Sequence, residues 1–299
     1  MSNIIYAPTS WNPISGCSPV SEGCANCWAK SMARRQRQEW GTVHLRDQRV
    51  LGQPLHWRKP RTVAVAFMGD LFHDQVPDEF IMQIWDYTFR LLPQHTFMVL
   101  TKRPERMQYW VKNWWRKLDP LPNVWLGVSC ENQARADERI PLLLDTPAAH
   151  RWISCEPLLG PIDLIGPVGL TFPLQICRHC MGGTVEATCE DKYGNCASCH
   201  GQCSGGSRLD WIVCGGESGP HARPCNLGWI RDIRDQCKAA GVPCYVKQMG
   251  ANPRLPTGGS YWNYYTQDYA AYKRRDRKGE NPDEWPADLR VREMPEGSE

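Results

Sequence analysis

Residues 62–73 read TVAVAFMGDLFH, an uninterrupted apolar run that ends in a polar cluster. Residues 62–68 have the length of a strand, and their hydrophobicity is continuous rather than alternating. This pattern is typical of a strand buried on both faces, as in a parallel sheet. The segment therefore predicts a parallel strand whose carboxyl end carries the polar residues of positions 68–73.

The same pattern recurs further along the chain. Apolar runs occupy residues 96–100, 124–128, 151–155, 211–214 and 243–246, and each ends in a polar or glycine-rich cluster: TKRPER (101–106), SCEN (129–132), SCEPLLG (154–160), GGESG (215–219) and KQMG (247–250). In a (β/α) barrel all strand ends converge on one face, whereas in a doubly wound sheet only those near the switch point meet. So many polar strand ends favour a barrel-like arrangement.

Helical stretches separate some of these runs. Residues 77–92 (PDEFIMQIWDYTFRLL) have helical spacing and begin with Pro-Asp-Glu, which suits a helix N-terminus. Residues 229–240 (WIRDIRDQCKAA) have the same spacing and are followed by Gly241 as a C-cap. Repeated strand–helix–strand units predict an α/β fold with a parallel sheet.

Two segments interrupt the pattern. Residues 166–206 are rich in Cys, Gly and polar residues, and the tail from 251 is rich in charge, proline and aromatics. We therefore expect a barrel formed by 1–165 and 207–250, a Cys-rich metal-binding insert at 166–206, and a C-terminal extension at 251–299. We expect the extension to be peripheral and partly disordered after Pro286.

The composition narrows the class of protein. The chain has 299 residues, a formal net charge of +3 and 15 cysteines. The cysteines are too sparse for a small disulfide scaffold, and a chain of this length can bury a core large enough to fold without disulfides. It begins without a basic region followed by an apolar one, and no apolar run approaches the roughly 20 residues that span a bilayer. We expect a cytoplasmic protein with no membrane partner, whose thiols fill the core, bind metals or catalyse.

Three cysteines lie close together near the N-terminus. Cys17, Cys24 and Cys27 have the spacing C-x6-C-x2-C in a loop rich in Gly, Ser and Pro. Structural zinc normally needs four ligands, and the fourth could be His44, His56 or His73. Three thiolates also suit an iron–sulfur cluster with one open iron. The spacing favours a cluster and leaves zinc and unliganded thiols as alternatives.

A second group lies in the insert. Its two C-x2-C pairs have the separation of a zinc ribbon, and Cys189, His200 and Cys203 lie nearby; the expected zinc ligands are Cys177, Cys180, Cys196 and Cys199. A structural zinc is favoured, with an auxiliary iron–sulfur cluster as the alternative. The remaining cysteines are interpreted as scattered thiols without special chemistry: Cys130, Cys155, Cys214, Cys225, Cys237 and Cys244.

An ordered series of motifs covers residues 5–250. It consists of TSWNPISGCSPVSEGCANCWAK, FMGDLFHDQVP, TKRPERM, NVWLGVSCEN, RWISCEPLLG, DWIVCGGESGPHARPC and WIRDIRDQCKAAGVPCYVKQMG. The series resembles the phage Gp37/Gp68 family, which is similar to radical S-adenosylmethionine (SAM) enzymes. The resemblance implies a partial (β/α) TIM-like barrel of the radical SAM type with a small zinc-ribbon-like insert. It also implies a [4Fe–4S] cluster on Cys17, Cys24 and Cys27, although most such enzymes have the spacing C-x3-C-x2-C.

The resemblance also implies roles for residues at the strand ends. The methionine amino group of SAM would be held at Met68, Gly69 and Asp70, and Gly215, Gly216 and Glu217 are further candidates for cofactor binding, although they lie much later in the chain than the usual glycine-rich edge. Ribose or carboxylate contacts would come from Ser129, Ser154 and Glu156. Glu156 and Lys102 are also candidate catalytic residues, and the cationic side chains of Lys102 and Arg103 suit a carboxylate or a phosphate.

The implied activity is reductive cleavage of SAM to a 5′-deoxyadenosyl radical, with an electron donor such as flavodoxin or ferredoxin. The implied substrate is a hypermodified thymidine in phage DNA, or a modified nucleotide, on which an isomerase moves an aminoacyl group from an N-link to a C-link. The chain would then be a phage protein in the host cytoplasm. Basic segments at 34–37 and 103–106 would supply phosphate contacts. The alternatives are a radical SAM DNA repair lyase and a non-catalytic zinc protein that binds nucleic acid.

Overall fold

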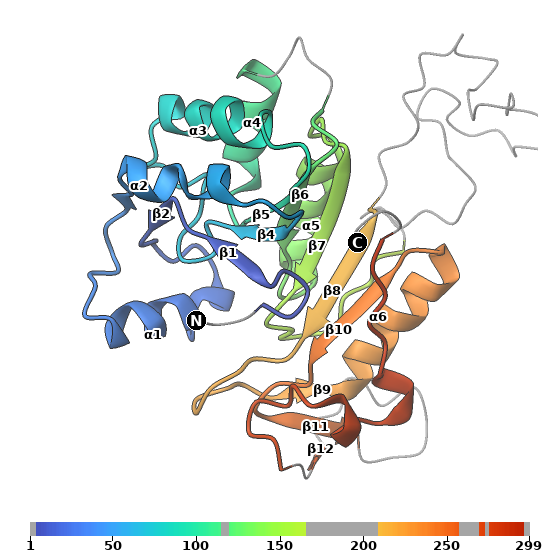
Figure 1. The fold of residues 1–299 in the computed structure, drawn as a ribbon. Helices are drawn as coiled ribbons and strands as arrows, with labels where there is room; N and C mark the ends of the chain where they lie inside the picture. The colour runs from blue at the N-terminus through green and yellow to red at the C-terminus, as the bar shows by residue number, and fades with distance from the viewer. Residues whose placement is uncertain (1–3, 115–119, 166–208, 257–268, 273–274, 296–299) are drawn as a thin grey trace, which may run out of the picture.

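The structure is a computed structural model that describes residues 4–114, 120–165, 209–256, 269–272 and 275–295. Its centre is a seven-stranded sheet in the order β1-β4-β5-β6-β7-β8-β10, in which every neighbouring pair is parallel. The sheet curls into a half-barrel (Figure 1). The bounds of its strands are β1 Thr9–Trp11, β4 Thr62–Val65, β5 Thr96–Thr101, β6 Val124–Ser129, β7 His150–Cys155, β8 Trp211–Gly215 and β10 Cys244–Gln248.

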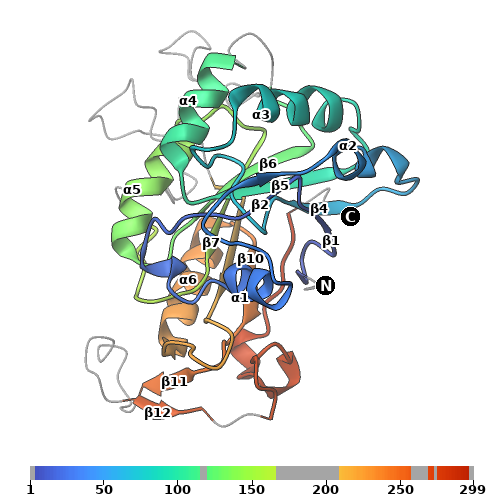
Figure 2. The same cartoon turned by 90° about the vertical axis from the view of Figure 1, so that its left-hand side faces the viewer.

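Helices cover the outer, convex side of this sheet, as Figure 2 shows for α4, α5 and α6. The helices are α1 Trp28–Arg35, α2 Gln48–Leu51, α3 Asp78–Ile84, α4 Pro104–Trp114, α5 Gln133–Leu144 and α6 Leu227–Ala240, with a π-helical turn at Trp85–Phe89 and 3-10 turns at Glu22–Cys24, Gln53–His56, Pro282–Glu284 and Ala287–Leu289. Two small sheets complete the fold: β2 Ile14–Ser15 with β3 His44–Leu45, and β9 Cys225–Asn226 with β11 Pro253–Pro256 and β12 Tyr269–Ala271.

The expected α/β fold with a parallel sheet is confirmed, and a curled half-barrel is compatible with a partial (β/α) barrel. The six apolar runs each form one strand. The strand expected at 62–68 ends at Val65, because Ala66 adopts a φ of 60° and turns the chain. The helix expected at 77–92 begins as α3 and continues as the π-helical turn. Gly241 caps α6 with a left-handed φ of 65°, as expected.

Successive side chains of each strand point to opposite faces of the sheet, so the apolar side chains form two cores. Outward side chains pack under the helices, whereas inward ones form a second cluster with the N-terminal segment. Tyr6 enters this inner cluster and makes edge-on ring contacts with Trp152, Trp211 and Tyr245. The concave side of the half-barrel is therefore filled by aromatic rings toward the amino ends of its strands.

The end of the chain differs from the sequence expectation. Leu289 is fully buried, and the Val246 N–H donates to the Val291 carbonyl at 2.8 Å. An isolated antiparallel bridge joins Tyr245 to Arg292. The prediction of disorder after Pro286 is wrong for residues 287–295, because this short segment covers the edge strand β10. The proposed domain boundaries stay a prediction.

None of the helices in the described ranges is long and apolar enough to cross a membrane.

Candidate functional site

Because the strands are parallel, their carboxyl ends meet at one edge of the half-barrel. The register places Ser129 beside Ser154, and Cys155 beside Cys214 just before Gly215. The inner face changes character along the strands: Trp125, Trp152 and Trp211 line it near the amino ends, while Ser129, Ser154 and Gly215 follow near the carboxyl ends. Small and polar residues therefore surround the mouth of the half-barrel, the edge at which (β/α) barrels carry their active sites.

Residues 16–27, here called the cysteine loop, carry Cys17, Cys24 and Cys27 and lie at this same edge. In Figure 1 the arrows of β8 and β10 point toward the side on which α1, the helix after the loop, lies. The Gly16 N–H donates to the Met68 carbonyl at 3.0 Å. Gly16 has a φ of 88°, and a side chain there would overlap the Thr42 carbonyl, so glycine is required at this turn.

The β5 end holds the start of the cysteine loop through Arg103. The guanidinium forms a buried ion pair with Asp70 at 3.1 Å and donates to the Cys17 sulfur at 3.5 Å. Its second nitrogen donates to the carbonyl and hydroxyl oxygens of Ser18, both at 3.0 Å. Asp70 also accepts from the Thr101 hydroxyl and from the backbone N–H groups of Phe72 and Lys102. Asp70 and Arg103 thus form a fixed clamp on Cys17 and Ser18.

The β6 end holds the middle of the cysteine loop through Glu131. This carboxylate is fully buried, forms an ion pair with Arg139 at 3.0 Å, and accepts from the Gly23 N–H at 3.3 Å and from the Ser21 hydroxyl. Gly23 is close enough that a Cβ on it would lie 2.8 Å from the carboxylate. The loop therefore packs directly on the strand end.

The β8 end holds the last part of the cysteine loop through Glu217. It accepts from the Asn26 amide at 2.9 Å and forms an ion pair with Arg223 at 2.7 Å. Burial opposes ionisation, yet the hydrogen bonds from Arg223 and Asn26 lower the pKa of Glu217. Arg223 also donates to the Glu22 carbonyl at 2.9 Å. The loop is thus fastened to three strand ends by charged side chains.

Between these anchors, Glu156 and Lys247 form a separate ion pair at 3.0 Å. The Ser154 hydroxyl donates to Glu156 at 3.4 Å, and the Lys247 ammonium lies 5.9 Å from the Tyr6 ring centroid. Ser154 lies in β7, Glu156 directly follows that strand, Lys247 lies in β10, and Tyr6 belongs to the inner aromatic cluster. A carboxylate with an adjacent ammonium can bind a zwitterion such as an amino acid moiety, or transfer a proton.

The surroundings of the cysteine loop shift the pKa values of Cys17 and His73. The pKa of Cys17 is raised to about 11, because burial and then the charge of Asp70 raise it by more than Arg103 lowers it. Burial and the charge of Arg103 lower the pKa of His73, whose Nε2 lies 2.8 Å from the Ser18 hydroxyl. The free thiol of Cys17 is therefore protonated near neutral pH, and His73 is neutral there.

The predicted site residues have different surroundings. Glu156 and Ser154 lie together at the mouth, and Met68 and Gly69 contact Gly16 of the cysteine loop. The Asp70 and Glu217 carboxylates form ion pairs with Arg103 and Arg223. The Ser129 carbonyl accepts a hydrogen bond from Arg139. Lys102 donates from its backbone to Asp70. The carbonyls of Gly215 and Gly216 accept from Leu158 and Gln248.

Sequence reasoning missed the anchoring residues Glu131 and Arg223, and it interpreted Arg103 as an anion ligand. The sequence contains one pattern that points to Glu131. Ser-Cys-Glu occurs twice, at 129–131 and 154–156, directly after two neighbouring strands. A repeated acidic residue at the same position of adjacent strand ends indicates a shared role at the mouth.

The donor set of the cysteine loop fits a thiolate-bound metal centre. Its three thiols are half-buried, come from one loop held on rigid strand ends, and are the soft ligands that iron–sulfur clusters prefer. Within the described ranges, no three His, Cys, Asp or Glu side chains are gathered closely enough to hold a metal ion. Of the other ligands considered, His44 and His56 are exposed, and His73 is bonded to Ser18. The predicted zinc ligands at 177–199 lie outside the described residues.

A protein-family model matches most of the chain. The family model described as a protein of unknown function (DUF5131) matches residues 1–286. The chain belongs to this family. Neither the curated proteins nor the solved structures contain a match to it. The family description assigns no activity.

Proposed function

We propose that this DUF5131 protein is a radical SAM enzyme in which Cys17, Cys24 and Cys27 hold a [4Fe–4S] cluster. The observation that carries the proposal is the position of the cysteine loop. Three half-buried thiols lie on a loop fastened across the carboxyl ends of parallel strands by Arg103, Glu131 and Glu217. When bound, such a cluster supplies the electron that cleaves SAM to a 5′-deoxyadenosyl radical.

The protein's own residues would hold and orient the reactants. Arg103 donates to the Cys17 sulfur, and donors of this kind stabilise thiolate ligands. Glu156 and Lys247 carry opposite charges at the mouth, as the amino and carboxylate groups of SAM require. The aromatic layer below them, from Trp152 to Tyr245, closes the inner face against water.

A nucleic-acid substrate is the second part of the proposal. Helix α1 follows the cysteine loop directly and exposes Lys30, Arg34, Arg35 and nearby Arg37, together with Trp28 at 38% exposure. In the part of the chain that the structure describes, no carboxylate pairs with these cations. Exposed cations beside an aromatic ring suit phosphates and an unstacked base. The most specific function that we propose is that of an isomerase, which moves an aminoacyl group on a hypermodified thymidine and receives electrons from flavodoxin or ferredoxin.

Metal loading and SAM cleavage test the chemistry. Protein reconstituted anaerobically is expected to bind about four irons per chain at the loop, to absorb near 400 nm, and to release 5′-deoxyadenosine under reductant. Cys24→Ala should abolish both iron binding and cleavage, whereas Cys225→Ala, a change in β9 away from the loop, should leave them intact. Zinc alone at the loop, with no cleavage in the wild-type protein, would contradict the proposal.

The nucleic-acid part has its own test. Arg34→Glu with Arg35→Glu should weaken binding to a DNA oligonucleotide and reduce its salt dependence, because two phosphate contacts are lost. The matched control is Arg58→Glu with Lys59→Glu, the same charge change on exposed residues before the amino end of β4. Equal losses in both double variants would show non-specific attraction only. Nucleoside masses after turnover then separate an isomerase, which conserves mass, from a lyase.

A further inference from the structure

Four carboxylates follow strands at the mouth of the half-barrel, and each forms an ion pair with a cation of the protein. The pairs are Asp70 with Arg103, Glu131 with Arg139, Glu156 with Lys247, and Glu217 with Arg223. Lys102 follows β5 at the same edge and stands outside these pairs. Its ammonium forms no ion pair or hydrogen bond with any residue that the structure describes. Lys102 is therefore a cation of the mouth without a counter-ion among the described residues.

Lys102 lies level with the serines of the mouth. The register pairs Thr101 with Val128 and Ser129 with Ser154, so the residue after Thr101 comes beside Ser129. The Ser129 carbonyl accepts from Arg139, whereas its hydroxyl makes no hydrogen bond within the described ranges. A cation and a hydroxyl donor, both without a partner among these residues, therefore stand on neighbouring strand ends.

The side chain of Lys102 continues the inner face of the half-barrel. Met98 belongs to the inner aromatic cluster and Leu100 packs against it, and alternate residues of a strand share one face. The Lys102 N–H donates to Asp70 at 3.1 Å, so the backbone from which the side chain starts is fixed. Lys102 is half-buried, and the attraction between charges rises as water is excluded. Its ammonium is thus placed to hold an anion above the inner face.

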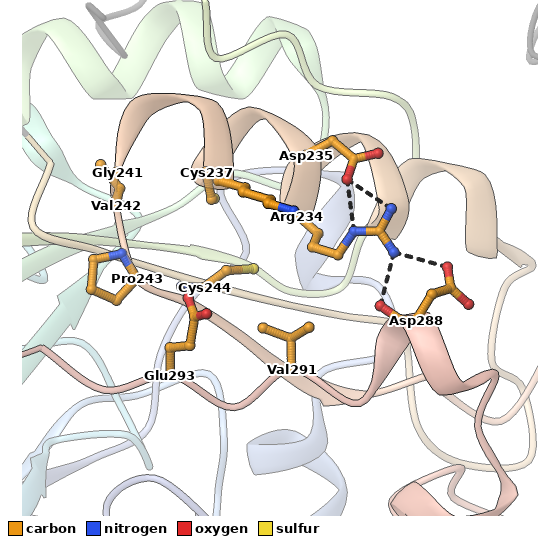
Figure 3. Close-up of a pocket in the computed structure, with 11 residues that line it drawn as sticks. Arg234, Asp235, Cys237, Gly241, Val242, Pro243, Cys244, Asp288, Val291 and Glu293 are labelled. Atoms are coloured by element: carbon orange, nitrogen blue, oxygen red, sulfur yellow. Dashed lines mark hydrogen bonds and ion pairs between the residues drawn. The ribbon is translucent and has the colours of Figure 1, made fainter. Parts of the chain in front are cut away.

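A cavity elsewhere in the molecule has the opposite balance of charge. It has a volume of about 630 Å³ and lies between the end of α6, the start of β10 and the C-terminal segment (Figure 3). Arg234 pairs there with Asp235 and Asp288. Glu293 lines the cavity as a third carboxylate, and Lys238 as a second cation. Because its carboxylates outnumber its cations, this cavity does not attract an anion as the mouth does.

We propose that Lys102, with the Ser129 hydroxyl beside it, binds an anionic group of the substrate, a carboxylate or a phosphate. Ammonium and hydroxyl groups both donate to such oxygens, and hydrogen bonds between charged groups are strong. The inference rests on the proposed radical SAM function, in which Glu156 and Lys247 take the amino and carboxylate groups of SAM. The anion at Lys102 then belongs to the second reactant, so the substrate is a molecule that carries an anion near its reacting carbon.

Calorimetric titration with matched probes tests this site on the reconstituted full-length protein. The first pair of probes is thymidine whose methyl carbon bears an N-linked glycine, and its neutral glycinamide analogue. The second pair is thymidine 5′-monophosphate and thymidine. The wild-type protein should bind the anionic member of at least one pair about tenfold more tightly than the neutral member, as one charge-assisted hydrogen bond implies. A preference in the first pair identifies a substrate carboxylate, and a preference in the second identifies a nucleotide phosphate.

Variants of Lys102 assign the preference to its ammonium. Lys102→Gln should remove the preference for the anionic probe while SAM affinity and iron content stay at the wild-type level, and Lys102→Arg, which keeps the charge, should retain it. The matched control is Lys59→Gln, the same change on an exposed residue before the amino end of β4, which should bind all probes like the wild-type protein.

Three results would overturn the inference: equal affinity of the wild-type protein for anionic and neutral probes, a preference that survives in Lys102→Gln, or a loss of SAM affinity in Lys102→Gln. The first comparison uses only the wild-type protein, so it decides even where a variant fails to fold. Probe binding requires no SAM cleavage. A wild-type protein that never cleaves SAM therefore contradicts the proposed function, whereas equal probe affinities contradict only the anion site.

Discussion

The cysteine loop and a second group of three cysteines, Cys214, Cys237 and Cys244, here called the thiol cluster, are built in opposite ways. The loop places its thiols within one short segment at the carboxyl edge of the sheet, half-exposed and held by charged side chains. The thiol cluster gathers its thiols from β8, α6 and β10, and buries them in an apolar core. Proximity in the sequence produces an open set of ligands, whereas proximity in the fold produces a closed set of thiols.

This difference predicts that substitutions in the two groups change the free energy of unfolding by different amounts. The loop depends on buried ion pairs, and removal of one partner leaves an uncompensated charge. The thiol cluster depends on packing, so its variants should lose less free energy of unfolding and affect no metal at the loop.

The largest effect is expected for Glu131→Ala. It leaves Arg139 buried without a counter-ion, and it removes the acceptor for Ser21 and Gly23. The free energy of unfolding should fall by about 3–5 kcal/mol. Denaturant titration measures this loss, and Lys112→Ala, which breaks the exposed pair with Asp145, is the control with little change. A loss below about 1 kcal/mol for Glu131→Ala would show that the loop does not depend on this anchor.

A smaller effect is expected for Arg103→Lys. Lysine keeps the charge beside Asp70, but one ammonium cannot also reach Cys17 and both oxygens of Ser18. Stability should fall by about 1–3 kcal/mol, since a planar guanidinium fork is replaced by a point charge. Alkylation of Cys17 should become faster, while the rate at Cys244 stays unchanged. Equal acceleration at both cysteines would mean global loosening rather than release of the loop.

The same contrast explains which features of the fold and of the site can be predicted from the sequence. Strand runs and the C-x6-C-x2-C loop are local patterns, and the structure contains the runs as strands of one parallel sheet with the loop at their carboxyl ends. The anchor Glu131 and the thiol cluster depend on which strands become neighbours, and no local pattern encodes that order. The order of the C-terminal segment is not predictable from its sequence, because backbone hydrogen bonds hold it along β10 and ion pairs of Asp288 with Arg231 and Arg234 hold it on α6, with few apolar side chains such as Leu289.

The next prediction concerns the thiol cluster itself. Cys214→Ala removes one buried sulfur from the core between the sheet and α6. Stability should fall by about 1 kcal/mol, the amount expected for a methyl-sized cavity. Iron content at the cysteine loop should remain at the wild-type level, as measured by metal analysis of the same preparation. Loss of iron in Cys214→Ala would show that the two groups are coupled through the sheet.

The smallest effect is a pH dependence at the cysteine loop. The pKa of His73 is lowered first by burial and then by Arg103, so in the window between this lowered value and its usual 6.5 the unfolded chain binds more protons than the folded one. Stability should therefore rise with pH through this window and be lost as the pH falls below about 6.5. Burial lowers the pKa of His95 and His150 as well, so His73→Gln should remove only part of the dependence of the unfolding free energy on pH. Unfolding free energies of both proteins, compared across this window, measure the difference. Since His73 contacts Ser18 of the loop, the alkylation rate of Cys17, divided by its thiolate fraction at each pH, should rise in acid in the wild-type protein and not in His73→Gln.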